Sequence, residues 1–146
     1  MSETNKELVR KVEEAWAKND LAAIDELIAA DLVSHDRPPM LPPGIEGAKA
    51  AHEMSMASFP DRSVTVEDIF AEDDRVAVRT TIRGTNTGGV PWLGVPPNGR
   101  AVQIESISIY RVADGKAVEH WGQNDVGALM MQLGATPPPA ATPAQT

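Results

Sequence analysis

Three histidines and a few carboxylates are the residues with which this chain could carry out acid–base chemistry. His120 lies in a segment with the character of a strand, and His35 lies immediately before Asp36. Histidine titrates near neutral pH, so it can give or take a proton without strong tuning by its surroundings. The sequence contains no cysteine, which excludes a thiol nucleophile and thiolate metal sites.

The two histidines each have a catalytic and a structural interpretation. His35 either lines the mouth of a pocket as an acid, base or ligand donor, or pairs with Asp36 at the surface. His120 either acts as the catalytic acid or base, or is a strand histidine that only forms a hydrogen bond to a neighbour. We take His120 as the first catalytic candidate and His35 as its partner.

Asp125 and His52 are the other titratable residues that need an interpretation. Asp125 could be the base or the carboxylate that orients His120, but it also precedes the apolar segment 126–133, where it would be a helix N-cap. We include it among the catalytic candidates. We interpret His52 as a solvent-exposed residue of a helix, beside Glu53.

A mainly apolar pocket with a few polar groups is expected around His120. Gly122 weakens the strand there but leaves room for a ligand where a side chain would stand. Pockets for small molecules are mostly apolar, and their few polar groups fix the orientation of the ligand. The residues expected to contact substrate are Trp16, Met54, Phe59, Trp92 and Leu93, with Ser106, Ser108 and Asn124 as hydrogen-bonding groups.

Charge and motifs exclude several classes of function. The net charge of −8 provides no basic surface for nucleic acid or an anionic membrane. There is neither a transmembrane-length apolar segment nor the apolar core of a signal peptide, so we expect a cytoplasmic protein. The chain has no HExxH, no glycine-rich phosphate loop, no GxSxG and no zinc-ligand spacing. We therefore expect no metal, no cofactor and no covalent intermediate.

The spacing of apolar residues predicts helices in the first part of the chain and strands in the second. Apolar residues recur every three or four positions in the helical segments and alternate in the strand segments. Prolines interrupt the chain at 37–44, and glycines and prolines fill a loop at 85–100. The predicted helices are 5–18, 21–30 and 45–59, and the predicted extended segments are 32–35, 64–69, 76–82, 101–112 and 116–124.

This order of elements is typical of an α+β fold, in which helices pack on one face of an antiparallel sheet. We predict a curved, cone-shaped antiparallel sheet of four to six strands, with the three helices on its concave face and a pocket between the layers. Asp114-Gly115 predicts a hairpin turn between the last two strands. The folded domain is predicted to span 1–134, and the Pro/Ala-rich segment 135–146 to be a disordered tail.

Four blocks of sequence, together with the order of elements, resemble the SnoaL-like polyketide cyclases of the nuclear transport factor two-like superfamily. The blocks read EEAWAKNDLAAIDELIAADLVSHD, FPDRSVTVEDIFAEDDRVAVRTTIRGTNTG, LGVPPNGR and IYRVADGKAVEHWGQND. The resemblance covers about 3–134. It implies a cone-shaped α+β fold and ring closure by an aldol reaction, with an aspartate base and without metal or cofactor.

The resemblance also shows where this chain departs from the family pattern. In the family the base is an aspartate in the last strand, two residues after a histidine. The histidine matches His120 here, and Gly122 stands at the position of the base. The preceding strand of those cyclases carries a glutamine and a histidine two positions apart, where this chain has Ser106 and Ser108.

Three functions remain open at this point. The first is a cofactor-independent acid–base enzyme of the cyclase, isomerase or lyase type, acting by aldol or enolate chemistry on a small hydrophobic carbonyl or polyketide-like compound. The second is a non-catalytic module that binds a small hydrophobic ligand. The third is an epoxide hydrolase, which would need Arg79 or Arg83 between two inward carboxylates. We also expect a homodimer, because Ile107, Ile109 and Trp121 present apolar side chains on the convex face of the sheet.

Overall fold

Helices form the first part of the chain, as the periodic apolar residues predict. The computed structural model describes residues 2–135. Helix α1 (Ser2–Ala17) buries Val9 and Val12 in the core. Helix α3 (Gly44–Ser58) follows the proline-rich loop and agrees with the predicted helix 45–59 within a residue at each end.

Helix α2 (Leu21–Leu27) is shorter than predicted. Asp20 caps its first turn by accepting a hydrogen bond from the backbone N–H of Ala23 at 3.1 Å. The prediction that the helix continues to residue 30 is wrong, because strand β1 (Ile28–Ser34) begins directly after Leu27. Ile28 is fully buried and pairs with Ala117, so pairing in the sheet overrides the helical tendency of the alanines that follow.

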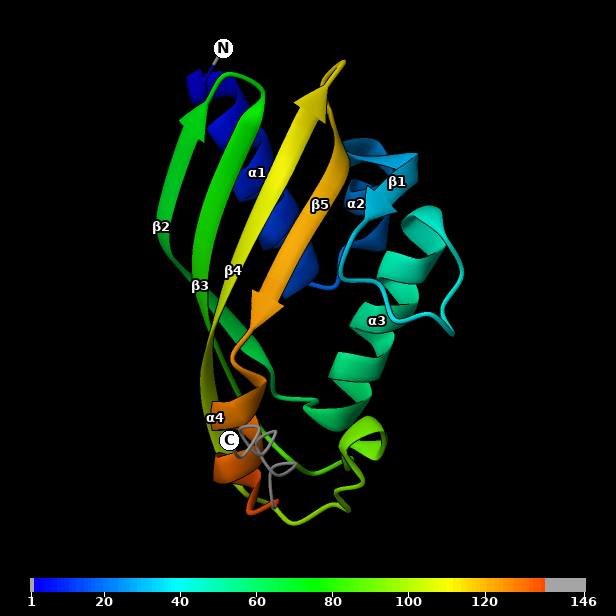
Figure 1. The fold of residues 1–146 in the computed structure, drawn as a ribbon, viewed down its shortest axis with the longest axis vertical. Coiled ribbons are helices and arrows are strands. Elements are labelled where there is room, and N and C mark those ends of the chain that lie inside the picture. The colour runs from blue at the N-terminus through cyan, green and yellow to red at the C-terminus, as the bar shows by residue number, and fades with distance from the viewer. Residues whose placement is uncertain (1, 136–146) are drawn as a thin grey trace, which may run out of the picture.

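Four long strands form the rest of the sheet, and no helix interrupts the segment 101–124. They are β2 (Ser63–Glu72), β3 (Arg75–Thr85), β4 (Ala101–Ala113) and β5 (Lys116–Asn124). The strand order is β1-β5-β4-β3-β2, and Figure 1 shows the sheet with α1 behind it. The predicted turn is confirmed, since Asp114 and Gly115 both have positive φ values, 52° and 74°, as a two-residue hairpin requires.

One pair of strands departs from the antiparallel arrangement that the sequence predicts. β2, β3, β4 and β5 pair antiparallel, but β1 pairs parallel to β5. Parallel neighbours need a long connection, and α3 and the whole antiparallel meander lie between these two strands in the chain. The sheet is therefore mixed, and β1 brings the residues that follow it to the edge of β5.

Two apolar clusters hold the helices against the sheet. The first contains Val12, Ile24 and Val76 and packs α1 and α2 on the strands. The second contains Phe59, Val102 and Leu133 and joins the end of α3 to β4 and to helix α4 (Val126–Leu133). In Figure 1 α4 lies at the opposite end of the molecule from α2. A cavity lies where the two clusters meet.

The loop between β3 and β4 and the C-terminal tail are the two irregular segments that the sequence predicts in the second half of the chain. After Thr85, which ends β3, the loop predicted at 85–100 contains a short 3₁₀ turn, Pro91–Leu93, and an isolated antiparallel bridge between Val90 and Val95. The predicted tail, 135–146, lies outside the described residues except for Ala135. Among the described residues, no helix is both long enough and apolar enough to span a membrane.

Candidate functional site

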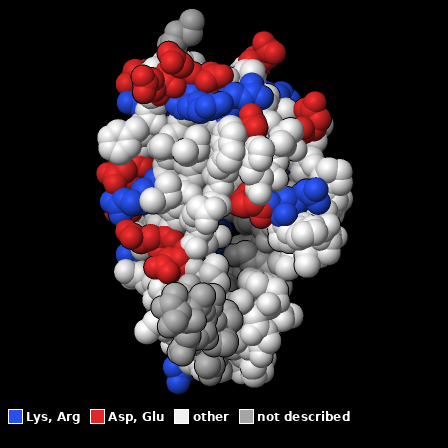
Figure 2. Space-filling model, in the orientation of Figure 1, with Lys and Arg blue, Asp and Glu red and all other residues white. Residues whose placement is uncertain are grey.

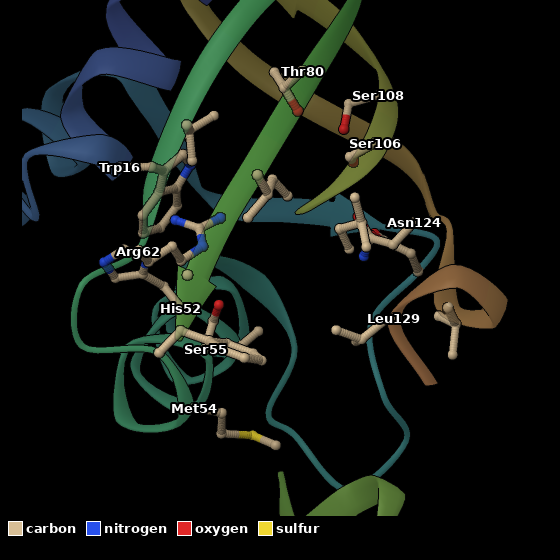
Figure 3. Close-up of a pocket in the computed structure, with 18 of the residues that line it drawn as sticks. Trp16, His52, Met54, Ser55, Arg62, Thr80, Ser106, Ser108, Asn124 and Leu129 are labelled. Atoms are coloured by element: carbon tan, nitrogen blue, oxygen red, sulfur yellow. The ribbon is translucent and has the colours of Figure 1, made fainter. Parts of the chain in front are cut away.

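A cavity of about 520 Å³ opens between the inner face of the sheet and the helices α1, α3 and α4. Its walls are mostly apolar. Figure 3 shows Trp16, His52 and Arg62 on one side and Ser106, Ser108 and Asn124 on the other. Of the predicted substrate-contacting residues, the cavity is lined by Trp16, Met54, Phe59, Trp92, Ser106, Ser108 and Asn124. Leu93 is absent from the lining and instead packs against the second apolar cluster.

The register of the strands brings polar groups together on the inner face. Ser108 of β4 stands opposite Gly122 of β5, and Ser106 stands opposite Asn124. The next row in the other direction pairs Tyr110 with His120. Because side chains alternate along a strand, these residues share one face, as the sequence pattern predicts for His120, Gly122 and Asn124.

His120 forms a hydrogen-bonded pair with Asp36. Its Nδ1 lies 3.0 Å from Oδ1 of Asp36, and its Nε2 lies 3.1 Å from the Ser108 hydroxyl. The Nδ1–H can donate to the carboxylate, while Nε2 pairs with the Ser108 hydroxyl on the other side of the ring. Asp36 and Ser108 line the cavity, and the His120 side chain, 17% exposed, lies directly behind them.

The parallel pairing of β1 with β5 brings Asp36 to this position. Ser34 stands beside His120 in the register, and the backbone N–H of His35 donates to the carbonyl of His120 at 2.9 Å. The chain then turns, and the Ser34 hydroxyl donates to Oδ1 of Asp36 at 2.9 Å. Two hydrogen bonds thus hold one carboxylate oxygen of Asp36.

Gly122 leaves the space that the Asp36 carboxylate occupies. A Cβ at position 122 would lie 2.5 Å from Oδ2 of Asp36 and 2.8 Å from Cε1 of His120. Real Cβ atoms essentially never approach other atoms so closely. A side chain at position 122 and the observed position of Asp36 are therefore mutually exclusive.

The surroundings of Asp36 favour its ionised form. Burial by itself would raise the pKa of Asp36, but the hydrogen bond and the charge of His120, with the hydrogen bond from Ser34, outweigh it and lower the pKa. The side chain is 34% exposed, so it is open to solvent from the cavity. Asp36 is therefore an ionised carboxylate that is held in a fixed orientation at the cavity wall.

A second polar group lines the cavity next to the first apolar cluster. The Tyr110 hydroxyl donates to Oε1 of Glu13 at 3.1 Å. Burial raises the pKa of Glu13. The hydrogen bond from Tyr110 and the charges of His120 and Arg62 act in the opposite direction, but their combined effect is smaller. The Nε of Arg62 is buried and has no hydrogen-bond partner among residues 2–135. Burial also lowers the pKa of Arg62, although the charge of Glu13 opposes this change.

His52 is not the solvent-exposed helix residue that the sequence suggested. Its side chain is buried, lines the cavity and packs against Trp16, with ring centroids 4.9 Å apart. Its Nε2 donates to Oδ1 of Asn19, 2.9 Å away. Burial, assisted by the positive charge of Arg62, lowers the pKa of His52 and favours the neutral ring. The prediction failed because α3 turns this position toward α1 rather than toward solvent.

Two of the three catalytic candidates lie away from the cavity. His35 stacks on Trp121, with ring centroids 4.8 Å apart, and its Nε2 lies 2.7 Å from Oε2 of Glu119. It therefore contacts neither His120 nor the cavity with its side chain. Asp125 caps α4 by accepting a hydrogen bond from the backbone N–H of Ala128 at 3.0 Å. The structure thus brings only His120 of the three to the site.

The arginine arrangement considered for an epoxide hydrolase exists, but on the wrong face. Arg79 lies between Asp68 and Glu105, with nitrogen–oxygen distances of 2.7 Å to each carboxylate. These side chains are partly exposed and stand on the face of the sheet opposite the cavity. The arrangement therefore gives no support to an epoxide hydrolase reaction in the cavity.

Sequence reasoning missed several polar residues of the cavity besides His52, among them Glu13, Asp36, Arg62 and Tyr110. Glu13 falls within the apolar stripe of α1, between Val9 and Trp16, and this position signals an inward carboxyl. Tyr110 has the same strand parity as Ser106 and Ser108. Arg62 and Asp36 lie in turns, where no periodicity indicates which way a side chain points.

Comparisons with known proteins place the chain in a family. A family model described as SnoaL-like polyketide cyclase matches residues 6–133. TsrD from Streptomyces laurentii superposes with a TM-score of 0.81 at 28% identity, covering 91% of this chain and 96% of TsrD. Among curated proteins, none matches this sequence.

Two further solved structures are more than 30% identical to this chain. IdmH from Streptomyces antibioticus, a proposed polyketide cyclase, has a TM-score of 0.78 and 35% identity, covering 90% of this chain and 99% of IdmH. AclR from Streptomyces galilaeus, a proposed hydroxylase, has a TM-score of 0.79 and 32% identity, covering 94% of this chain and 89% of AclR. The same fold therefore carries proteins to which different reactions are assigned.

Proposed function

This chain belongs to the SnoaL-like polyketide cyclase family, and from that premise we propose that it is a cofactor-independent acid–base enzyme. Its substrate is a small, mainly apolar carbonyl compound that loses a proton from the carbon next to the carbonyl group. One observation carries the proposal: the hydrogen-bonded pair of Asp36 and His120 stands at the wall of a mostly apolar cavity, where Asp36 occupies the space above Gly122.

Asp36 is the general base in this mechanism. Its Oδ1 is held by His120 and Ser34, which leaves Oδ2 for a proton of the substrate. The C–H bond breaks, the proton moves to Oδ2, and the electron pair moves to the carbonyl oxygen to form an enolate. His120 positions the carboxylate, and the hydrogen bond with the Ser108 hydroxyl fixes the orientation of the His120 ring.

The remaining steps decide the type of reaction. An enolate that attacks a second carbonyl of the same molecule forms a C–C bond and closes a ring, as in a cyclase. If the substrate has a conjugated C=C bond, the enolate extends over it, and return of the proton from Asp36 to the far carbon completes an isomerisation. Thr80, Ser106 and Asn124 face the cavity in one row across β3, β4 and β5, where their hydroxyl and amide groups can donate to the enolate oxygen.

The test measures proton abstraction without knowledge of the natural substrate. The probe is 2-tetralone, an apolar two-ring ketone, and the readout is hydrogen–deuterium exchange at its acidic carbons, followed by NMR in D₂O. We expect the protein to accelerate exchange and Asp36→Asn to lower the accelerated rate by roughly 10²–10⁴-fold, the usual contribution of a positioned base. Asp31→Asn, which removes an exposed carboxylate of β1, is the matched control.

A rescue variant makes the test specific for the position of the carboxylate. The double variant Asp36→Ala with Gly122→Asp frees the space that the side chain at position 36 occupies and moves the carboxylate to the place where the family pattern has its base. We expect it to regain part of the lost exchange rate. Exchange by the wild-type protein at the buffer rate, together with saturable binding of 2-tetralone, would refute the enzyme and support the alternative of a ligand-binding module in this apolar cavity.

A further inference from the structure

We propose that Arg62 makes one end of the cavity an anion-binding site, and that the substrate carries a carboxylate on its apolar body. This inference rests on the proposed function only in that both use the same cavity. It assigns Arg62 to recognition of the substrate and leaves proton transfer to Asp36.

Arg62 lies in the short connection between α3 and β2, and its side chain lines the cavity. Figure 3 shows its guanidinium group beside Trp16 and His52. The Nε atom is buried and has no hydrogen-bond partner, and the guanidinium forms no ion pair with any carboxylate of the described chain. A charged group with a buried, unpartnered N–H is costly, because that N–H has lost water and gained nothing in exchange.

The protein itself does not supply the missing negative charge at close range. Glu13 is near enough for its charge to affect Arg62, but its Oε1 is engaged by the Tyr110 hydroxyl. His52 offers no charge of opposite sign, and its Nε2 donates to Asn19. An anionic group of a ligand would therefore satisfy the Arg62 guanidinium.

The geometry of a guanidinium favours a carboxylate over a single oxygen. The two terminal Nη groups of a guanidinium each present an N–H on the edge away from Nε, and together these match the two oxygens of a carboxylate, which gives two parallel charge-assisted hydrogen bonds. Trp16, Met54 and Phe59 form apolar walls for the rest of the molecule.

Charge also fixes the direction in which such a ligand lies. Asp36 is ionised and stands beside Ser108, which lies across the cavity from Arg62 in Figure 3. A carboxylate is attracted by Arg62 and repelled by Asp36. A ligand with its carboxylate on Arg62 therefore presents its other end to the base.

The experiment uses two probes of nearly equal shape, 2-naphthoate and the neutral 2-naphthamide, and measures binding of each by isothermal titration calorimetry. We expect the wild-type protein to bind 2-naphthoate at least tenfold more tightly than 2-naphthamide. Arg62→Met should weaken 2-naphthoate binding by roughly 10- to 100-fold and leave 2-naphthamide binding within about threefold. Arg10→Met removes an exposed arginine of α1 and is the matched control for the change in net charge.

A second variant separates recognition from folding. Arg62→Lys keeps the positive charge but loses the paired N–H groups of the guanidinium, so it should retain part of the preference for 2-naphthoate. Equal binding of the two probes by the wild-type protein would overturn the inference, as would equal weakening of both probes by Arg62→Met. Asp36→Asn should keep the preference for 2-naphthoate, so failure of the proposed base and failure of the anion site give different results.

Discussion

At the scale of single residues, we propose that Asp36 supplies the carboxylate that the family pattern places in the last strand. Gly122 removes a side chain from β5, and Asp36 fills that volume from a turn 84 residues away from His120. Its Oδ1 is held by His120 and by Ser34, so the turn positions the carboxylate through its own hydrogen bonds. The absence of a side chain at position 122 thus leaves the space for the Asp36 carboxylate.

Gly122→Ala should reduce activity while leaving the fold intact. The new Cβ would displace the Asp36 carboxylate, which is partly exposed and therefore has space to move away, and the hydrogen bond to His120 would be lost. A base displaced by about 1 Å costs roughly 10²-fold in rate, whereas we expect the free energy of unfolding to change by less than about 1 kcal/mol.

Exchange of 2-tetralone and urea denaturation measure these two effects. Gly127→Ala is the matched control, because the nearest atom to a Cβ at position 127 is 3.8 Å away, an ordinary contact distance. A Gly122→Ala variant with the exchange rate of the wild type would show that the observed position of Asp36 is not needed.

Of the hydrogen-bonded pair His120 and Asp36, the sequence predicts the position of His120 but not that of Asp36. His120, Gly122 and Asn124 share a face because strand residues alternate, and this periodicity is visible in the sequence. The position of Asp36 depends on parallel pairing of β1 with β5, which no local pattern indicates. The sequence does not show that Asp36, rather than His35, faces His120, because the direction of a side chain in a turn depends on the tertiary structure.

At the scale of elements, α1 and β4 meet at the Glu13–Tyr110 hydrogen bond inside the cavity. Because burial raises the pKa of Glu13 above its ordinary value of 4.5, the folded protein holds this proton at pH values where the unfolded chain has released it. The stability that Glu13 contributes is therefore fully present below pH 4.5 and is lost as the pH rises through the raised pKa.

Glu13→Gln should change the pH dependence of stability in a defined direction. Glutamine keeps an oxygen that can accept from Tyr110 but does not titrate. Relative to the wild type, the variant should gain free energy of unfolding as the pH rises above 4.5. Urea denaturation at a series of pH values measures the difference, with the exposed neighbour Glu14→Gln as control. A difference that does not vary with pH, or falls as the pH rises, would contradict this expectation.

Helix α4 depends on Asp125, so Asp125→Ala should destabilise the protein by about 1 kcal/mol, the usual effect of losing an N-cap. Asp125→Ser retains a capping oxygen and should retain most of the stability. Both variants should keep the 2-tetralone exchange rate if the residue only caps the helix. Thermal denaturation measures the first effect. A loss of exchange in the stable serine variant would return Asp125 to the catalytic residues.

The helices could be predicted because their buried residues are the apolar residues that recur every three or four positions in the sequence. Val9, Val12 and Trp16 repeat at helical spacing, and each contacts the core. The boundary at Ile28 was not predictable, because the segment that follows Leu27 has both helical and strand tendencies. Only the partner strand β5 decides between them.

At the scale of the whole molecule, the two faces of the sheet differ. The inner face bears the cavity and the helices, whereas the outer face leaves large apolar side chains in solvent. Phe70 is 68% exposed, Ile107 53% and Ile109 38%. Figure 2 views the molecule from the side of the sheet and shows uncharged surface across the centre, below a row of basic residues.

Charges at the two ends of this outer face are complementary. On one side of the apolar centre, Asp68 and Glu105 flank Arg79, the register partner of Ile107. At the other end Arg75 lies over the Trp121 ring, and Arg111 pairs with Glu119. A twofold axis through the apolar centre would place the end with more carboxylates on the end with more arginines. We therefore propose that a second copy of this chain covers the outer face, as the apolar residues of β4 predict.

Ile107→Asp should dissociate this dimer without unfolding the chain. The side chain is more than half exposed in the single chain, so an aspartate there changes the stability of the monomer by about 0.5 kcal/mol or less. In a dimer the same carboxylate would be buried without a partner at the centre of the interface, where it is strongly unfavourable. Sedimentation velocity at micromolar concentration should show a dimer for the wild type and a monomer for the variant. Met131→Asp, which alters an exposed apolar residue of α4, should remain dimeric. A monomeric wild type, or a variant that stays dimeric, would refute association through the outer face.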